Sequence, residues 1–216
     1  MNLQPTMFHP CCGPDILQSV RYFAGSVERI DVCDIWPRLL GYMESQVGFH
    51  RSSTIEHRFE VESSGGTIHS ARNSREFTPP AVGELIEGSC TLPDKTIPLA
   101  RIHCYDAVEA LRQIESFSIF FFRRDCPTEG EGSSGIPFLG DTLFKRVLAK
   151  LSPDGLVVTD GAGMIGPAAQ SALWTAPREP DPVGRCFESF GRRFRCVRVL
   201  SRDRTPTLVW QSEAIS

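Results

Sequence analysis

The segment HPCCGPD, at residues 9–15, gathers several side chains that could bind a ligand within one short stretch. It follows an apolar run that begins at Met7, and it comes before the helix-like repeat ILQSVRYF at 16–23. This order predicts a strand, a tight turn and a helix. Turns that approach a cofactor usually contain several glycines, because glycine permits close contact and positive φ. Here only Gly13 is present, so the segment indicates a cofactor-binding turn that has lost most of its glycines.

The elements that position this turn are predicted from apolar periodicity and from turn residues. Further strands are expected at 27–35, 99–106, 117–122 and 155–161, and further helices at about 37–43, 107–114 and 138–151. The turn Ser152–Gly155 precedes the last of these strands. Strands that alternate with helices form a parallel sheet with helices on both faces.

Two regions depart from this alternation. The apolar runs FRCVRVL and PTLVWQ are separated only by SRDRT, which is too short for a crossover helix, so they must pair antiparallel. Residues 47–97 form an insertion, in which EHRFEVESSGGTIHSARN predicts a β-hairpin around Ser63–Gly66. The stretches EGSC and LPDKTIP of the insertion have loop-like composition.

Composition and charge exclude several classes of protein. A net charge of −3 argues against a nucleic-acid protein, which needs a basic surface to neutralise phosphates. No window approaches the roughly 18 apolar residues of a membrane span, and no secretory signal precedes residue 10, so we expect a cytoplasmic protein. Of the eight cysteines only Cys11 and Cys12 are close together, and adjacent cysteines do not form a zinc knuckle. No metal is therefore expected.

Four motifs, taken in order, make the chain similar to the class I S-adenosylmethionine-dependent methyltransferases. HPCCGPD corresponds to the family's first motif, IDVCDI to its second strand, HCYDA to its third strand, and KLSPDGLVVTDG to its fifth strand with the preceding turn. The closing hairpin corresponds to the last two strands of that family. The likeness covers nearly all of residues 1–216 except the insertion at about 47–97. It implies a single S-adenosylmethionine-binding α/β domain of Rossmann-like, doubly wound architecture. Its mostly parallel seven-stranded sheet carries a C-terminal antiparallel β-hairpin and a β-rich insertion.

The resemblance also implies which residues contact S-adenosylmethionine. Asp34 would bind the ribose hydroxyls and Asp106 the adenine amino group. The alternatives are that Asp34 only solvates a strand end and that Asp106 only caps the helix after it. The full set of implied cofactor contacts is His9, Cys11, Gly13, Asp15, Asp34, Ile35, Asp106, Ala107 and Arg123.

The first motif departs from the family's pattern at three positions. His9 stands where the family has an acidic residue, Cys11 replaces the first glycine, and Asp15 replaces the last. S-adenosylmethionine has no pyrophosphate, so these changes weaken the site without abolishing it. Asp15 has two interpretations of equal weight: a carboxylate near the positive end of the ligand, or a helix cap.

The resemblance implies methyl transfer to a small-molecule acceptor as the function. Methyl transfer needs alignment more than acid–base groups, so catalytic residues are hard to recognise. The predicted catalytic set is Asp125, Tyr105 and Trp174. Because the first motif is altered, an alternative is cyclisation or lyase chemistry, in which S-adenosylmethionine is the sole substrate and methylthioadenosine is released. A second alternative is a non-catalytic protein that binds S-adenosylmethionine. No membrane or nucleic-acid partner is expected, and a homodimer is the one protein partner proposed.

Overall fold

The computed structural model describes residues 5–10, 12–34, 38–58, 66–69, 74–77, 82–105, 107–122, 141–160, 182–201 and 207–215. Contacts between residues divide the chain into two compact units. His9–Ile114 makes up most of the first unit, and the second contains Pro5–Phe8, Glu115–Arg124 and Leu139–Ser216. The first strand, β1 (Thr6–Pro10), therefore contributes its beginning to the second unit and its end to the first.

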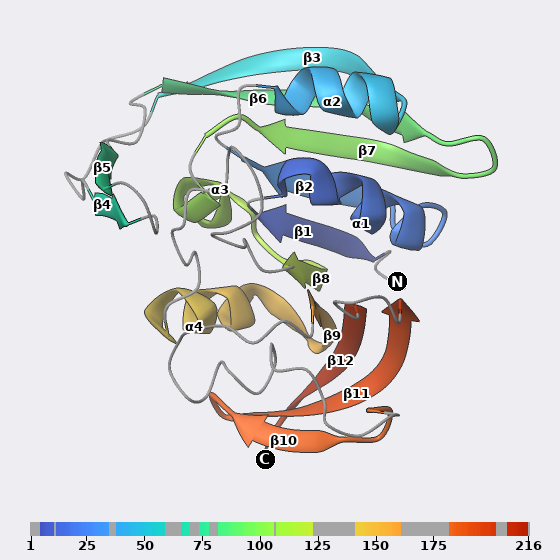
Figure 1. The fold of residues 1–216 in the computed structure, drawn as a ribbon, viewed down its shortest axis with the longest axis vertical. Coiled ribbons are helices and arrows are strands. Elements are labelled where there is room, and N and C mark those ends of the chain that lie inside the picture. Colours follow the sequence, from blue (N-terminus) through green and yellow to red (C-terminus); the bar gives the residue numbers. More distant parts are fainter. Residues whose placement is uncertain are drawn as a thin grey trace. The chain divides into compact units, whose positions relative to one another are not determined.

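The first unit begins with the predicted strand, turn and helix (Figure 1). After β1 the chain forms a 3₁₀ turn, η1 (Gly13–Asp15), and the helix α1 (Ile16–Phe23). The spacing of Ile16, Val20 and Phe23 places all three on the buried face of α1. Asp15 occupies the position before the helix, but its side chain makes no capping hydrogen bond, so the capping interpretation of Asp15 is wrong. The chain leaves α1 at Gly25, which has φ +78.

The rest of the first unit alternates as expected up to the insertion. Its elements are β2 (Arg29–Cys33), α2 (Leu39–Gln46), β3 (Phe49–Arg58), β6 (Val82–Thr91), β7 (Thr96–His103) and α3 (Ala107–Gln113), with a separate small hairpin of β4 (Gly66–His69) and β5 (Ser74–Phe77). Strand β2 is parallel to β7, and the order continues from β7 to β6 and β3. Helices α1 and α2 contact each other (Figure 1).

The predicted pairing within the insertion is wrong. His57 and its neighbours in β3 do not fold back onto Gly66–His69; they pair with β6, which lies some 25 residues further along the chain. β6 in turn pairs antiparallel with β7. The stretch EGSC, predicted as loop, lies inside β6, and the last residues of LPDKTIP begin β7. The insertion therefore widens the sheet of the first unit by two long antiparallel strands.

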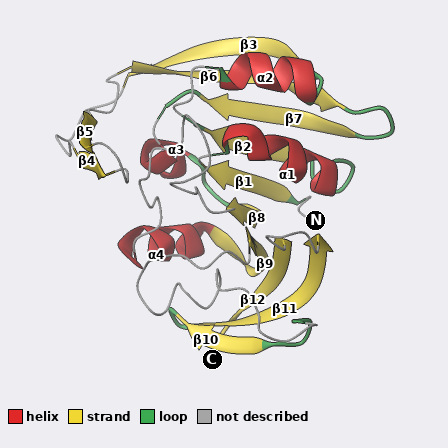
Figure 2. Cartoon of the chain, in the orientation of Figure 1, coloured by secondary structure: helices red, strands yellow, loops and turns green. Residues whose placement is uncertain are grey.

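The second unit consists mainly of strands (Figure 2). Its elements are the beginning of β1, β8 (Phe117–Phe122), α4 (Asp141–Lys150), β9 (Leu151–Asp160), β10 (Cys186–Ser189), β11 (Arg192–Ser201) and β12 (Thr207–Ala214). β8 is parallel to both β1 and β9. β11 and β12 form the predicted antiparallel hairpin, and β12 pairs with β9. β10, which the sequence analysis missed, pairs antiparallel with β11.

The predicted turn at Ser152–Gly155 is an irregularity inside β9. Phe117 is opposite Leu151 and Ile119 is opposite Leu156, so β9 has three more residues than β8 across this step. These extra residues bulge out of the ladder, as turn-forming residues allow. The strand therefore starts four residues earlier than predicted, at Leu151.

The fold class is thus α/β with a mixed sheet. The three pairs β2–β7, β1–β8 and β8–β9 are parallel, but those of the insertion and of the C-terminal hairpin are antiparallel. The prediction of a mostly parallel, seven-stranded sheet is therefore wrong in detail, because ten of the described strands belong to the main sheet. Among the described residues, every helix is too short or too polar to cross a membrane.

Candidate functional site

The turn η1 and the carboxyl end of β2 are joined by a direct hydrogen bond. The backbone N–H of Gly13 donates to Oδ2 of Asp34 over 2.7 Å. The N–H of Cys12 donates to the carbonyl of Cys33 over 3.3 Å. Asp34, the residue after β2, donates its own N–H to the carbonyl of His103 at 3.4 Å. Three predicted features, the turn and the ends of two neighbouring parallel strands, therefore meet within the first unit.

Gly13 has a backbone conformation that suits glycine. Its φ is +42, in the left-handed region that residues with a Cβ rarely adopt. The nearest atom to a Cβ built on Gly13 is Oδ2 of Asp34, at 3.9 Å, which is an ordinary contact. The cost of a side chain here is therefore backbone strain and not a collision.

We expect the substitution Gly13→Ala to lower the free energy of unfolding by about 1–2 kcal/mol through this strain. Gly41→Ala is the matched control, because Gly41 lies inside α2 with no atom within 4 Å of an added Cβ. Alanine favours a helix, so the control should be neutral or stabilising by about 0.5–1 kcal/mol. Urea unfolding followed by circular dichroism measures both variants. Equal effects of the two substitutions would contradict a special role for the conformation of Gly13.

His9 lies at the end of β1 and is buried, with 1% of its surface exposed. Its Nδ1 lies 2.9 Å from Oγ of Ser19, and that hydroxyl donates to the carbonyl of Ile16 over 3.1 Å. Since the Ser19 proton is used, the imidazole donates from Nδ1. The side chain thus connects β1 to α1, and the predicted contact between His9 and a cofactor stays a prediction.

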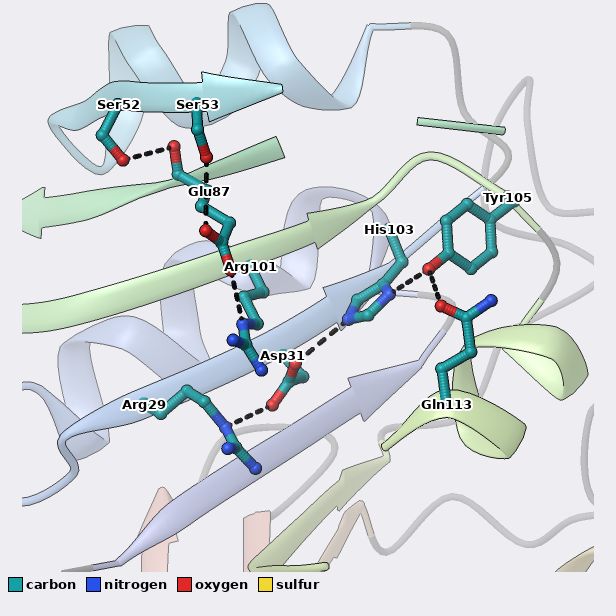
Figure 3. Close-up of polar contacts among 9 residues, drawn as sticks. All are labelled: Arg29, Asp31, Ser52, Ser53, Glu87, Arg101, His103, Tyr105 and Gln113. Atoms are coloured by element: carbon teal, nitrogen blue, oxygen red, sulfur yellow. Dashed lines mark hydrogen bonds and ion pairs between the residues drawn. The ribbon is translucent and has the colours of Figure 1, made fainter. Parts of the chain in front are cut away.

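A polar network, buried at Asp31, His103 and Tyr105, runs from β2 through β7 to α3 (Figure 3). Nε of Arg29 lies 2.8 Å from Oδ2 of Asp31. Oδ1 of Asp31 lies 3.0 Å from Nε2 of His103, and Nδ1 of His103 lies 2.6 Å from the Tyr105 hydroxyl. That hydroxyl donates to Oε1 of Gln113 over 3.1 Å. One histidine therefore links the strand that ends at Asp34 to the segment that leads into α3.

Burial decides what these groups can do. Asp31 is 1% exposed, so its carboxylate depends for its stability on the hydrogen bond with His103 and on the charge of Arg29. Tyr105 is also 1% exposed, and burial raises the pKa of its hydroxyl above the ordinary value. The hydroxyl is protonated at neutral pH and already has two partners. These contacts suit a positioning role for Tyr105, and its predicted catalytic role stays a prediction.

Two described cysteines of the first unit are held as thiols. Burial raises the pKa of Cys90 to about 12. It raises the pKa of Cys104 to about 11, with a smaller contribution from the charge of Glu84. A thiolate is the nucleophile and the metal ligand, so neither residue is suited to such chemistry at neutral pH. Within the described ranges, no group of three His, Cys, Asp or Glu residues is arranged to hold a metal ion.

The structure brings some of the predicted site residues together. Gly13 and Asp34 are in contact, Asp15 ends the same 3₁₀ turn, and Tyr105 and Ala107 lie between β7 and the start of α3. The remaining predicted residues, Cys11, Ile35, Asp106, Arg123, Asp125 and Trp174, lie outside the described residues. The sequence analysis missed Asp31, His103 and Gln113. Asp31 and His103 could have been found, because each is a polar residue inside an otherwise apolar strand.

No protein-family model and no curated protein sequence matches the chain. Several solved structures resemble it weakly, among them the two that follow. The protein yhhF from Escherichia coli, which carries a provisional methyltransferase name, aligns with a TM-score of 0.42 and 10% identity, over 99% of this chain and 80% of its own. Trm1 from Pyrococcus horikoshii, solved in complex with S-adenosyl-L-methionine, aligns with a TM-score of 0.45 and 11% identity, over 97% of this chain and 50% of its own. At these scores neither likeness assigns a function to the chain.

Proposed function

We propose that the chain binds S-adenosylmethionine at the turn η1 and transfers its methyl group to a small-molecule acceptor. The observation that carries the proposal is the 2.7 Å hydrogen bond from the Gly13 N–H to Asp34. It joins the altered first motif to the acidic residue after the second strand, two of the parts of the sequence that resemble class I methyltransferases. In parallel α/β sheets ligands bind at the carboxyl ends of the strands, where both residues lie.

The described residues fit the nucleoside part of this cofactor. Asp34 is only partly buried, and a carboxylate can accept several hydrogen bonds, so it can accept one from a ribose hydroxyl as well as that from Gly13. Gly13 has no side chain, which lets a ligand approach the backbone. Ala107 is a small residue that begins α3. Together with Asp106, it is proposed to contact adenine.

The cofactor itself supplies an activated methyl group on a positively charged sulfur. The protein then has to align the acceptor with that methyl group and exclude water. Asp15 is proposed to lie near the positive end of the ligand, since it ends the turn η1 that begins at Gly13. The predicted catalytic residues Asp125 and Trp174 are proposed to contact the acceptor.

Binding and turnover can be tested in two steps. Calorimetry should detect binding of S-adenosylmethionine and of S-adenosylhomocysteine, and no comparable binding of ATP as a control nucleotide. Purified protein should then produce S-adenosylhomocysteine when it is incubated with S-adenosylmethionine and a panel of small nucleophiles. Methylthioadenosine formed from S-adenosylmethionine alone would instead indicate the cyclisation or lyase alternative. Absence of binding by either sulfur nucleoside would contradict every version of the proposal.

A further inference from the structure

Strand β3 is a long edge strand with an exposed surface. It is the last strand in the order β2-β7-β6-β3, and no other strand in the described part of the chain pairs with its outer edge. Seven of its ten residues are exposed, on both faces of the sheet. Ile55, near the middle of β3, has 44% of its surface exposed. An edge strand of this length offers a row of unpaired backbone N–H and C=O groups.

An irregularity in β3 places two opposite charges on one face. Arg51 is opposite Gly88 of β6 and Ser53 is opposite Glu87, so Ser52 is an extra residue that forms a bulge. Glu56 is opposite Glu84. Gly88 and Glu84 are separated by four positions of a regular strand and share a face. Arg51 and Glu56 therefore also share a face, although their spacing of five would otherwise put them on opposite faces.

This arrangement is self-complementary about Thr54. If two copies of β3 pair antiparallel around a two-fold axis at Thr54, Arg51 of each copy lies opposite Glu56 of the other. On the other face, Ser53 of one copy lies opposite Ile55 of the other, and the two Ile55 side chains are diagonal neighbours. A two-fold interface requires such matching of a surface with itself. From this register we propose that β3 is the contact surface of a homodimer, which joins the sheets of two first units edge to edge.

The groups that form this contact are free to rearrange. Arg51 lies 3.8 Å from Glu44, and Glu56 lies 3.4 Å from Arg58, but all four side chains are substantially exposed. Ion pairs in water stabilise little, so each can be exchanged for a pair across the axis. Pairing of one strand edge buries a small area, and the dimer belongs to the weak class of interfaces. Centring on Ile55 instead places Arg51 opposite Arg58, and centring on Glu56 places the two Glu56 side chains opposite each other.

The test is a charge-reversal experiment measured by sedimentation equilibrium over a wide range of concentrations. Wild-type protein should show a reversible monomer–dimer equilibrium. Arg51→Glu alone, or Glu56→Arg alone, should raise the dissociation constant about tenfold, because each places like charges opposite one another twice per dimer. The double variant Arg51→Glu with Glu56→Arg should restore dimerisation. Circular dichroism verifies that each variant is folded.

Arg193→Glu serves as the control, since Arg193 forms an exposed ion pair with Glu188 on the β10–β11 ladder. It should leave the dissociation constant unchanged. A protein that is monomeric at every concentration overturns the proposal. So does a dimer that is insensitive to the single reversals, because that dimer uses another surface. Neither result bears on cofactor binding, so this inference and the proposed function can fail separately.

Discussion

The variant Asp34→Ala should lose roughly 1.5–3 kcal/mol of binding free energy for S-adenosylmethionine, measured by calorimetry. A charged acceptor for a ribose hydroxyl makes a strong hydrogen bond, and Asp34 lies where the turn η1 meets the end of β2. The same substitution removes the acceptor of the Gly13 N–H, so some of the loss could come from a disordered turn. The variant Asp34→Asn separates the two effects. Its amide oxygen can still accept from Gly13, but its charge is gone.

We therefore expect Asp34→Asn to retain wild-type stability in urea while it still binds S-adenosylmethionine more weakly. Asp154→Ala is the control, because Asp154 is an exposed carboxylate within β9 of the second unit. It should change neither property. If Asp34→Asn and Asp34→Ala both bind the cofactor as tightly as the wild type, Asp34 is a strand-end carboxylate without a ligand, and the proposed site is wrong.

The sequence analysis succeeded where local pattern and tertiary structure agree. The strand Phe117–Phe122 has its predicted bounds because six consecutive apolar or small residues fit only a buried strand. The helix α1 follows directly from the spacing of its apolar residues. The closing hairpin was determined by chain length, since the five residues SRDRT cannot form a crossover.

The sequence analysis failed where the pairing of strands depends on residues that are distant in the sequence. β3 is polar and mostly exposed, so its sequence contains no signal for its partner. The glycines at 65–66 suggested a local turn, whereas His57 pairs with Gly83. Similarly, Ser152–Gly155 has turn composition, but the parallel partner β8 extends the strand past it as a bulge. Long-range pairing overrides local turn preference in both places.

For the site, the sequence indicated the backbone positions better than the side-chain network. The strand–turn–helix pattern located Gly13, and the last acidic residue of the second strand located Asp34, since both follow from the order of the elements. The hydrogen bond between Asp31 and His103 joins residues 72 positions apart, and only the pairing of β2 with β7 brings them together. A single sequence gives the polarity of these residues and not their partner.

The second large effect, on the free energy of unfolding, is expected from substitution of His103. The substitution His103→Leu leaves Oδ1 of Asp31 and the Tyr105 hydroxyl without their common partner in a buried region. Leaving a buried charged group without a hydrogen-bond partner costs about 1–3 kcal/mol or more, and only Arg29 is then left to compensate the Asp31 carboxylate. Urea unfolding should therefore show a large fall in stability. Tyr105→Phe is the graded comparison: it removes the hydrogen bonds of one hydroxyl but keeps the contact between His103 and Asp31, so it should cost about 1 kcal/mol.

The double variant Asp31→Leu with His103→Leu decides whether the loss of stability in His103→Leu comes from the buried carboxylate that has lost its hydrogen-bond partner. Without Asp31 no charge is buried at this position, and Arg29, which is 26% exposed, can turn its guanidinium to water. The double variant should therefore be more stable than His103→Leu alone, as expected when a buried polar pair is replaced by apolar side chains. If the losses of stability in the single variants Asp31→Leu and His103→Leu simply add in the double variant, His103 stabilises the protein by packing. The hydrogen bonds of the network then contribute little. The coupling between the two substitutions thus measures how firmly this pair holds β2 to β7, the strands whose carboxyl ends carry Asp34 and Tyr105.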